Sequence, residues 1–438
     1  MKLIKFFIIF FLFGFNKNAN AQNTFSNLDE LLSFVKTKSI TLQQGDIKFT
    51  QAKKAKLAAI IGVLDPTNVN SFTVNNNLRQ QVLVVPSEAF GGASGGFNEL
   101  IIGTKYVNTL NVNLDIKLIN LAGWENLKLA RINIQKNEVD NKLNEKNLNE
   151  NIASAFFNII HIQEQIKQNE QNLKSAITLF YTSESKYALG LVKQQDVNDA
   201  KASFLTTQEN NKQLVFLETQ NILLLKILCD IPESQALVIK NNIATKTIQE
   251  KPLITSNELN FKSNELKEKY ALSNYRQNKL SLLPTASFVF SNNVQQNTSN
   301  FELFNSSVKW INSYYVGLKL SFGLPTAKSI SQVYNAKFDY QLAQKNSEQS
   351  KIKSEIEFKQ LNIDFDKAIS QAKANDEIFK LRKDTYDKNQ KLYSEGLIGI
   401  DQTLNSYNAM VNANYNAISS LINIQLAQSR IDINNKIN

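Results

Sequence analysis

Two stretches of the chain carry apolar residues at spacings that alternate between three and four. In the first, the apolar positions are Leu148, Ile152, Ala155, Ile159, Ile162 and Ile166, with Leu173, Ala176 and Phe180 in phase. In the C-terminal stretch they are Leu404, Tyr407, Val411, Ile418 and Leu421, and Asn414 and Gln425 interrupt the stripe. This heptad-like spacing predicts long helices that pack through an apolar seam, as in a coiled coil.

Ahead of each helical stretch the period changes to two. The even positions from 106 to 118 are mostly apolar, and the odd positions include Asn111, Asn113, Asp115 and Lys117. The pattern returns from 310 to 322, with Tyr314, Val316, Leu318, Leu320 and Phe322 on one side. Such alternation predicts strands with one apolar face, and we expect partner strands around 72–85 and 285–294. Strands of this length suit a tilted crossing of a membrane.

Gly and Pro, which end or weaken helices, are scarce and unevenly placed. The chain has 14 Gly and 6 Pro among 438 residues, which argues against collagen-like and turn-rich all-β classes. Neither residue occurs in 124–189, 191–231, 326–395 or 400–438. A continuous helix over the longest of these stretches would be roughly 100 Å long.

A single offset of 206 residues relates the two halves of the chain. It pairs Leu114 with Leu320, Ala130 with Ala336, Tyr187 with Tyr393, and Gly190 with Gly396. This regularity predicts a tandem duplication. We therefore expect a first repeat at 22–231 with a β-hairpin at about 67–118, a crossover at 232–258, and a second repeat at 259–438 with a β-hairpin at about 284–323.

The N-terminus has the pattern of a secretory signal peptide at 1–21. Lys2 and Lys5 precede an apolar run from Phe6 to Phe15, and Ala19-Asn20-Ala21 offers a small-residue cleavage site. Removal of this segment with Lys2, Lys5 and Lys17 lowers the formal net charge from +10 to 10 − 3 = +7. Export argues against a nucleic-acid partner, and the surplus is typical of a solvated, lysine-rich surface.

Little in the sequence favours catalysis. The chain has one cysteine, Cys229, and one histidine, His161, so an intrachain disulfide or a Cys/His zinc site is excluded. Residues 91–96 are rich in Gly but lack the Lys-Ser/Thr of a phosphate loop, and we expect an extracellular hairpin loop there. We predict no catalytic residues, no cofactor and no metal, and therefore no enzyme.

Four strands of this kind cannot close a barrel alone, and an open sheet edge in lipid leaves backbone groups without partners. Closure must then come from other copies of the chain. Helices spaced about 10 Å apart would form a ring with a bore near 28 Å in a trimer, against about 15 Å in a dimer. The predicted fold class is a mixed α/β membrane protein: a long α-helical coiled-coil barrel plus a transmembrane β-barrel completed by trimerisation, with internal duplication.

With these features the chain resembles the TolC family of outer-membrane export channels. The resemblance rests on the duplicated order of hairpin and long helices, on 187–192 with 196–200, and on the matching 393–398. It implies a homotrimer, a 12-stranded barrel in outer-membrane lipid, and a helical barrel in the periplasm. The trimer would meet a periplasmic adaptor (membrane fusion protein) and an inner-membrane pump. The implied function is the exit duct of a tripartite efflux or type I secretion system; the alternative is a secreted periplasmic coiled-coil adaptor or scaffold.

The resemblance also implies a periplasmic tip that closes the pore and docks the adaptor. The candidate residues are Gly190, Leu191, Val192, Asp196, Asp199, Gly396, Leu397, Ile398 and Asp401. The family gate pairs an acid such as Asp196 with an arginine just beyond the second glycine, where this chain has Leu397 and Ile398. We therefore expect apolar contacts among Leu191, Val192, Leu397 and Ile398 to close the tip. Asp196, Asp199 or Asp401 would supply an acidic ring.

Overall fold

The computed structural model describes residues 23–240, 255, 258–303, 305 and 307–437. The predicted signal peptide and most of the predicted crossover lie outside these residues. The chain divides into two compact units. One comprises residues 1–47, 138–263 and 348–438, and the other comprises 48–137 and 264–347. Helices α3 (Ile40–Leu64), α4 (Leu121–Ala188), α6 (Leu259–Leu280) and α7 (Ala327–Ser394) contribute residues to both units.

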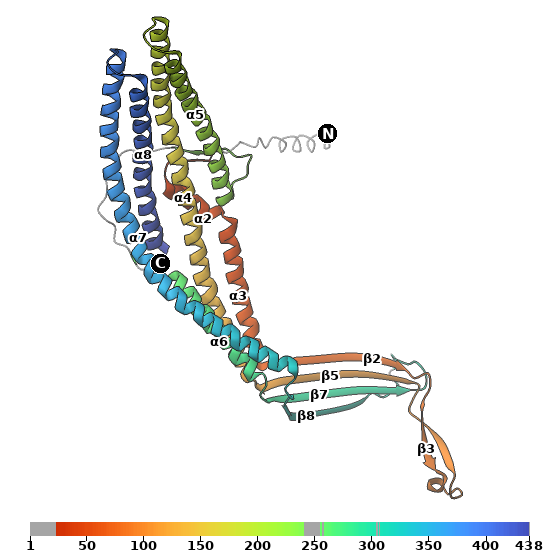
Figure 1. Cartoon of the computed structure of the whole chain (residues 1–438). Coiled ribbons are helices and arrows are strands. Elements are labelled where there is room, and N and C mark those ends of the chain that lie inside the picture. The colour runs from red at the N-terminus through yellow and green to blue at the C-terminus, as the bar shows by residue number, and fades with distance from the viewer. Residues whose placement is uncertain (1–22, 241–254, 256–257, 304, 306, 438) are drawn as a thin grey trace, which may run out of the picture. The chain divides into compact units, whose positions relative to one another are not determined.

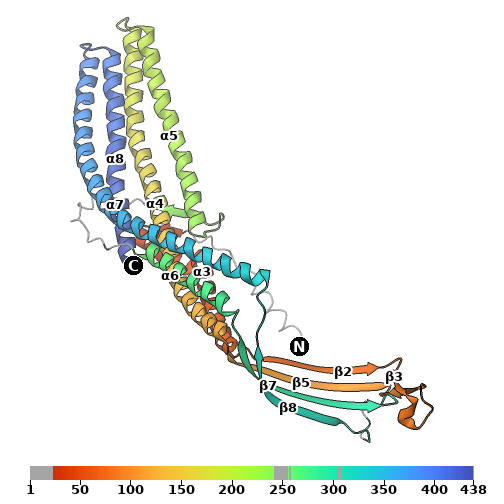
Figure 2. The same ribbon diagram turned by 60° about the horizontal axis from the view of Figure 1, so that its bottom comes forward.

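The long helices confirm the predicted rods and the predicted duplication. Helices α4 and α7 each contain 68 residues, and their first residues are 327 − 121 = 206 positions apart. Helices α5 (Gln194–Leu228) and α8 (Ile400–Ile437) also begin 400 − 194 = 206 positions apart. In Figures 1 and 2, α4 runs beside α5 and α7 runs beside α8. Each half of the chain therefore supplies one antiparallel helical pair.

The first unit has its main apolar core where α4 passes the N-terminal segment. Ile152, Ala155 and Ile159 of the predicted stripe are buried there, together with Leu225 of α5. The short helix α2 (Leu28–Lys38) adds Leu31 and Val35 to the same core. Strand β1 (Asn23–Phe25) pairs in parallel with β6 (Leu237–Ile239), which places residues 23–25 beside the segment that follows α5. Burial of this seam fixes the middle of the helical pairs.

The predicted stripe of α8 needs a correction. Leu421 is 46% exposed, whereas Asn414, which was expected to interrupt the stripe, is 5% exposed. The Asn414 amide donates a hydrogen bond to Gln168 Oε1 of α4 at 3.3 Å. A buried amide is tolerated because it has this partner. The contact between α4 and α8 is thus more polar than the heptad pattern indicates.

In the second unit, four antiparallel strands form one sheet. They are β2 (Thr67–Asn76), β5 (Tyr106–Ile119), β7 (Thr285–Thr298) and β8 (Ile311–Ser321), in the order β2-β5-β7-β8. Figures 1 and 2 show them side by side. The helices join the sheet at one end, because α3 leads into β2 and β5 leads into α4. The same holds for α6 before β7 and for α7 after β8.

The register confirms the alternation that was predicted from the sequence. Directly paired residues lie on the same face of a sheet. Leu114 pairs with Phe290 and Phe288 pairs with Leu318 on the apolar face, whereas Asn111 pairs with Asn293 on the other. The polar face carries its charges near the helical end, where Lys319 donates to the Asp115 carboxylate at 3.1 Å. One face therefore suits lipid and the other suits water.

The partner strand expected at about 72–85 is wrong as one piece. Strand β2 ends at Asn76, and β3 (Gln81–Pro86) pairs with β4 (Phe97–Ile102) in a separate two-stranded sheet. The Asn77 N–H donates to the Lys105 carbonyl at 2.7 Å, and Leu78 beside it is exposed. The Gly-rich segment 91–96 lies in the connection between β3 and β4, after the short 3-10 helix Ser87–Phe90.

Candidate functional site

Each pair of long helices reverses direction at a glycine with left-handed backbone geometry. Gly190 has φ 71° and Gly396 has φ 79°. The Gly190 N–H donates to the Tyr187 carbonyl and the Leu191 N–H to the Lys186 carbonyl, both at 2.9 Å. Gly396 and Leu397 repeat these two bonds at 3.1 and 2.9 Å. This is the Schellman arrangement, which satisfies the last carbonyls of a helix and favours glycine.

The predicted acidic residues have different local roles. The Asp196 carboxylate accepts the Lys193 N–H at 2.9 Å and so caps the first turn of α5. Asp199 and Asp401 are exposed, and Asp401 lies in the first turn of α8. The position equivalent to Asp196 in the second repeat is Gln402. The first turn of each helix therefore carries one aspartate, but Asp401 lies one position before the equivalent of Asp196.

The four predicted apolar residues do not form one cluster within a chain. Leu191 and Leu397 are 68% and 67% exposed, and Val192 is partly exposed. Ile398 packs against Leu179, Tyr393 and Ile400. Within one chain, one residue of this group is thus packed and two are largely exposed.

Tyr393 joins the two helical pairs at this end, a role that sequence reasoning missed. Its hydroxyl and the Ser183 hydroxyl form a hydrogen bond of 2.9 Å. The Lys186 ammonium donates to the Tyr393 carbonyl and lies 4.3 Å from the centre of its ring. Burial of the side chain raises the pKa of the Tyr393 hydroxyl. In the sequence Tyr393 stands out only as the match of Tyr187 in the repeat, which does not indicate this contact.

A second polar contact lies farther from the turns. The Tyr407 hydroxyl of α8 donates to the Asn172 carbonyl of α4 at 3.1 Å and is 3.1 Å from Thr207 Oγ1 of α5. The Tyr415 hydroxyl donates to Asn169 Oδ1 at 2.8 Å. Burial raises the pKa of Tyr407 to about 12 and also raises that of Tyr415. These tyrosines stay protonated at neutral pH, so they act as hydrogen-bond donors that align the two pairs.

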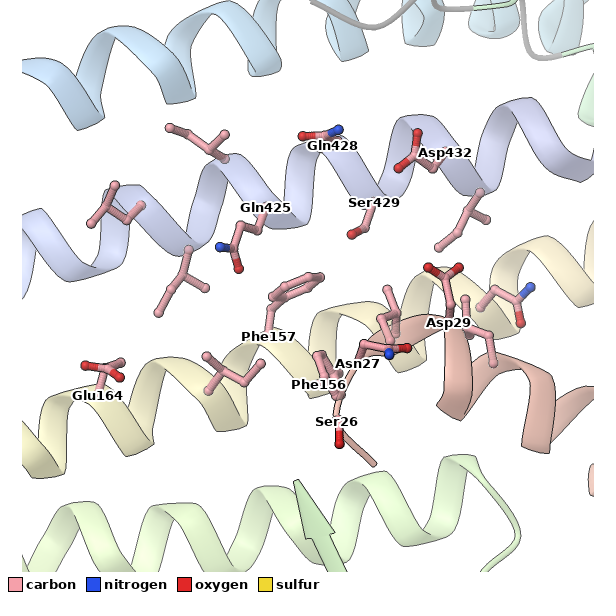
Figure 3. A pocket seen from close by; sticks show the side chains of 18 of the residues that line it. Ser26, Asn27, Asp29, Phe156, Phe157, Glu164, Gln425, Gln428, Ser429 and Asp432 are labelled. Atoms are coloured by element: carbon pink, nitrogen blue, oxygen red, sulfur yellow. The ribbon is translucent and has the colours of Figure 1, made fainter. Parts of the chain in front are cut away.

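A cavity of about 1390 Å³ lies between α2, α4 and α8 in the first unit (Figure 3). Its lining includes the apolar residues Phe156, Phe157 and Ile418. Charged groups also line it, and four of them form two ion pairs: Lys36 with Glu145 at 3.3 Å and Lys436 with Asp29 at 2.9 Å. Nothing in this lining has the arrangement of a nucleophile and a base.

The chain has one cysteine and one histidine, and burial disfavours the charged form of each. Cys229 is buried, and burial raises the pKa of its thiol to about 12, so the reactive thiolate is absent at neutral pH. His161 is half-buried, and burial lowers the pKa of its imidazole. Within the described residues, no three His, Cys, Asp or Glu side chains gather as a metal site would require. Nor does any helix in the described part of the chain have the length and apolar character to cross a membrane.

Comparisons with known proteins show a matching family model and several similar folds. Residues 100–217 match the family model of the outer membrane efflux protein. The fold is similar to that of CusC, at 14% identity over 92% of this chain and 90% of that chain, with a TM-score of 0.72. VceC of Vibrio cholerae is 13% identical over 93% of this chain and 95% of that chain, with a TM-score of 0.67. The open state of MtrE of Neisseria gonorrhoeae is 13% identical over 94% of this chain and 88% of that chain, with a TM-score of 0.66. No curated protein matches the sequence.

The resemblance to the TolC family of outer-membrane channels is therefore confirmed. The predicted combination of a helical part with a strand part is confirmed as well. The matched family is one of the outer membrane, which agrees with the predicted location, and it consists of channel proteins and not of enzymes.

Proposed function

We propose that the protein is the outer-membrane exit duct of a tripartite efflux or type I secretion system, which conducts substrate passively from its periplasmic tip to the exterior. The observation that carries this proposal is the sheet β2-β5-β7-β8. It has one apolar face, one polar face and two free edges, and long duplicated helices follow its hairpins. The alternative, a secreted coiled-coil scaffold, gives no reason for a sheet with a lipid-type face.

The free edges are the argument for a closed assembly. Strands β2 and β8 each pair on one side only. A free edge in lipid would leave its N–H and C=O groups without partners, and transmembrane barrels have at least eight strands. We therefore propose that β8 of one copy pairs with β2 of the next in a homotrimer of twelve strands. The polar face, with Asn111 and Asn293, then lines the lumen.

The duplication indicates how the helical pairs meet between copies. Within one chain, α4 contacts α7 and α8 through Ser183 with Tyr393 and Asn172 with Tyr407. The equivalent contact, shifted by 206 residues, brings α7 of one copy against α4 and α5 of the next. Large apolar side chains are exposed on both surfaces that would meet: Ile352, Ile363 and Leu381 on α7, and Phe216 and Ile227 on α5. Burial of such surfaces favours association.

We propose that the residues around the two turns dock a periplasmic adaptor, which would connect the duct to an inner-membrane pump. Leu191 and Leu397 support this proposal, because both are exposed beside the turns. In the trimer the same two residues would gather around the axis with Val192 and Ile398. We also propose domain boundaries at 21, 231 and 258, which separate the signal peptide, the first repeat, the crossover and the second repeat.

Conductance in a planar bilayer tests the function. We expect the protein to stay in the membrane when cells are subjected to osmotic shock. After extraction with detergent, it should form ion-conducting channels. Release by osmotic shock together with no conductance would favour the scaffold alternative.

The acidic ring is tested separately, by comparing the unaltered protein with Asp196→Ala, Asp199→Ala and Asp401→Ala. Conductance and cation selectivity that stay the same in all three variants would contradict that part of the proposal.

A further inference from the structure

The hairpin β3–β4 is an apolar ribbon that pairs with no other strand among the described residues. Its residues are almost all exposed, and they include Leu83, Val84, Leu100 and Ile101. Leu83 pairs with Leu100 on one face, and Val82 pairs with Ile101 on the other. Both faces are therefore apolar. An isolated two-stranded hairpin is at best marginally stable in water, so this ribbon needs a covering surface.

The ribbon also has two free edges and little charge to protect them. Between residues 80 and 103 the charged side chains are Glu88 and Glu99. Glu88 is engaged at the tip, where its carboxylate accepts the Gly95 N–H at 2.7 Å. Natural edge strands commonly carry lysines that prevent pairing with another chain, but β3 and β4 have none.

The position of the ribbon points to a second copy of this chain as the partner. Figure 1 shows it continuing beyond the ends of β2 and β5, away from the helices. The ladder is nearly continuous: Asn76 pairs with Tyr106, and Gln81 pairs with Ile102 after a neck of four residues against three. Strand β2 is an edge of the four-stranded sheet. The ribbon thus extends from the seam where the next copy joins.

We propose that the β3–β4 ribbons of neighbouring copies pack against one another at the outer mouth of the barrel and form an intersubunit contact separate from the barrel and the helices. This inference rests on the proposed trimer. Three ribbons that leave one rim have a local concentration in the millimolar range, which favours mutual packing over capture of a dilute partner. Among the described residues of the second repeat, no further strands lie between β7 and β8, which residues 299–310 join.

Single cysteines test the contact, since the native Cys229 is buried and unreactive. Leu83→Cys and Ile101→Cys place a thiol on each face of the ribbon. The matched control is Asn300→Cys, in the exposed connection of the other hairpin at the same end of the sheet. With a short bis-maleimide on outer membranes, we expect chain-to-chain crosslinks in most copies of at least one ribbon variant. The control should give traces, and its thiol should react freely with a water-soluble maleimide.

Three outcomes would overturn the proposal. A trimer whose ribbon cysteines label freely and do not crosslink would leave the duct intact but remove the ribbon contact. Ribbon cysteines that are protected in membranes, exposed in detergent and never crosslinked would assign the ribbon to a lipid surface. A protein that forms no trimer, judged by its native mass, would remove both this proposal and the proposed function.

Discussion

At the scale of single residues, buried tyrosines decide how the two helical pairs align. Tyr407 donates to the Asn172 carbonyl and contacts Thr207 Oγ1, so Tyr407→Phe removes two buried hydrogen bonds between the helical pairs. We expect a loss of about 1–2 kcal/mol in the free energy of unfolding. The variant should also change how the free energy of unfolding declines at high pH. In the unfolded chain the hydroxyl ionises near pH 10, but in the folded protein only at about 12. The folded state therefore holds this proton longer, and its stability falls as the pH rises from 10 to 12.

Thermal unfolding in detergent across that pH range measures both effects. Tyr407→Phe should show a lower unfolding temperature at neutral pH and a weaker decline above pH 10 than the unaltered protein. Tyr181→Phe is the control, because the Tyr181 side chain is exposed and its hydroxyl already contacts water. Equal declines in the unaltered protein and in Tyr407→Phe would show that the tyrosine is not a buried donor.

The turn glycines give a second test at this scale. Neither Gly190 nor Gly396 has an atom within 4 Å of an added Cβ, so Gly190→Ala introduces backbone strain without a clash. Left-handed geometry costs an alanine about 1–2 kcal/mol, and we expect that loss of stability. Gly62 in α3 has equally open surroundings but no left-handed φ. Gly62→Ala should therefore stabilise by roughly 0.5–1 kcal/mol. A neutral Gly190→Ala would contradict the Schellman geometry.

At the scale of elements, the start of α5 separates a structural acid from a free one. Asp196→Ala removes the acceptor of the Lys193 N–H and the acidic charge of the first turn, and should cost about 0.3–1 kcal/mol at that helix end. Asp199 is exposed one turn later, so Asp199→Ala should leave the helix end unchanged. Hydrogen exchange of the first turn of α5 checks this difference. Faster exchange in both variants, or in neither, would show that Asp196 is not a cap.

Helices and strands were largely predictable because their periods are written along the chain. The offset of 206 fixed the starts of both α7 and α8 from those of α4 and α5. The split of 72–85 was not predictable, because the run at 82–85 is apolar without alternation and residues 77–80 contain neither Gly nor Pro. The role of Tyr393 was equally hidden. Tyr187 and Tyr393 match in sequence, yet their side chains are 46% and 2% exposed, a difference that arises only when the two pairs meet.

At the scale of the whole molecule, each repeated element has a surface that another copy of the chain would cover. The sheet has edges at β2 and β8, and α7 and α5 expose apolar side chains where the next copy would lie. A symmetric ring satisfies both needs with the contacts that one chain already makes internally. Substituting Ile352 and Leu381 of α7 with glutamate should therefore weaken assembly of the copies while leaving the internal contact between α4 and α8 intact.

The native mass of the detergent-extracted protein, measured by light scattering with the detergent contribution subtracted, tests the central claim most directly. Closure of four-stranded sheets into a twelve-stranded barrel predicts the mass of three chains. A particle with the mass of one chain, stable and still rich in strand signal, would contradict the account.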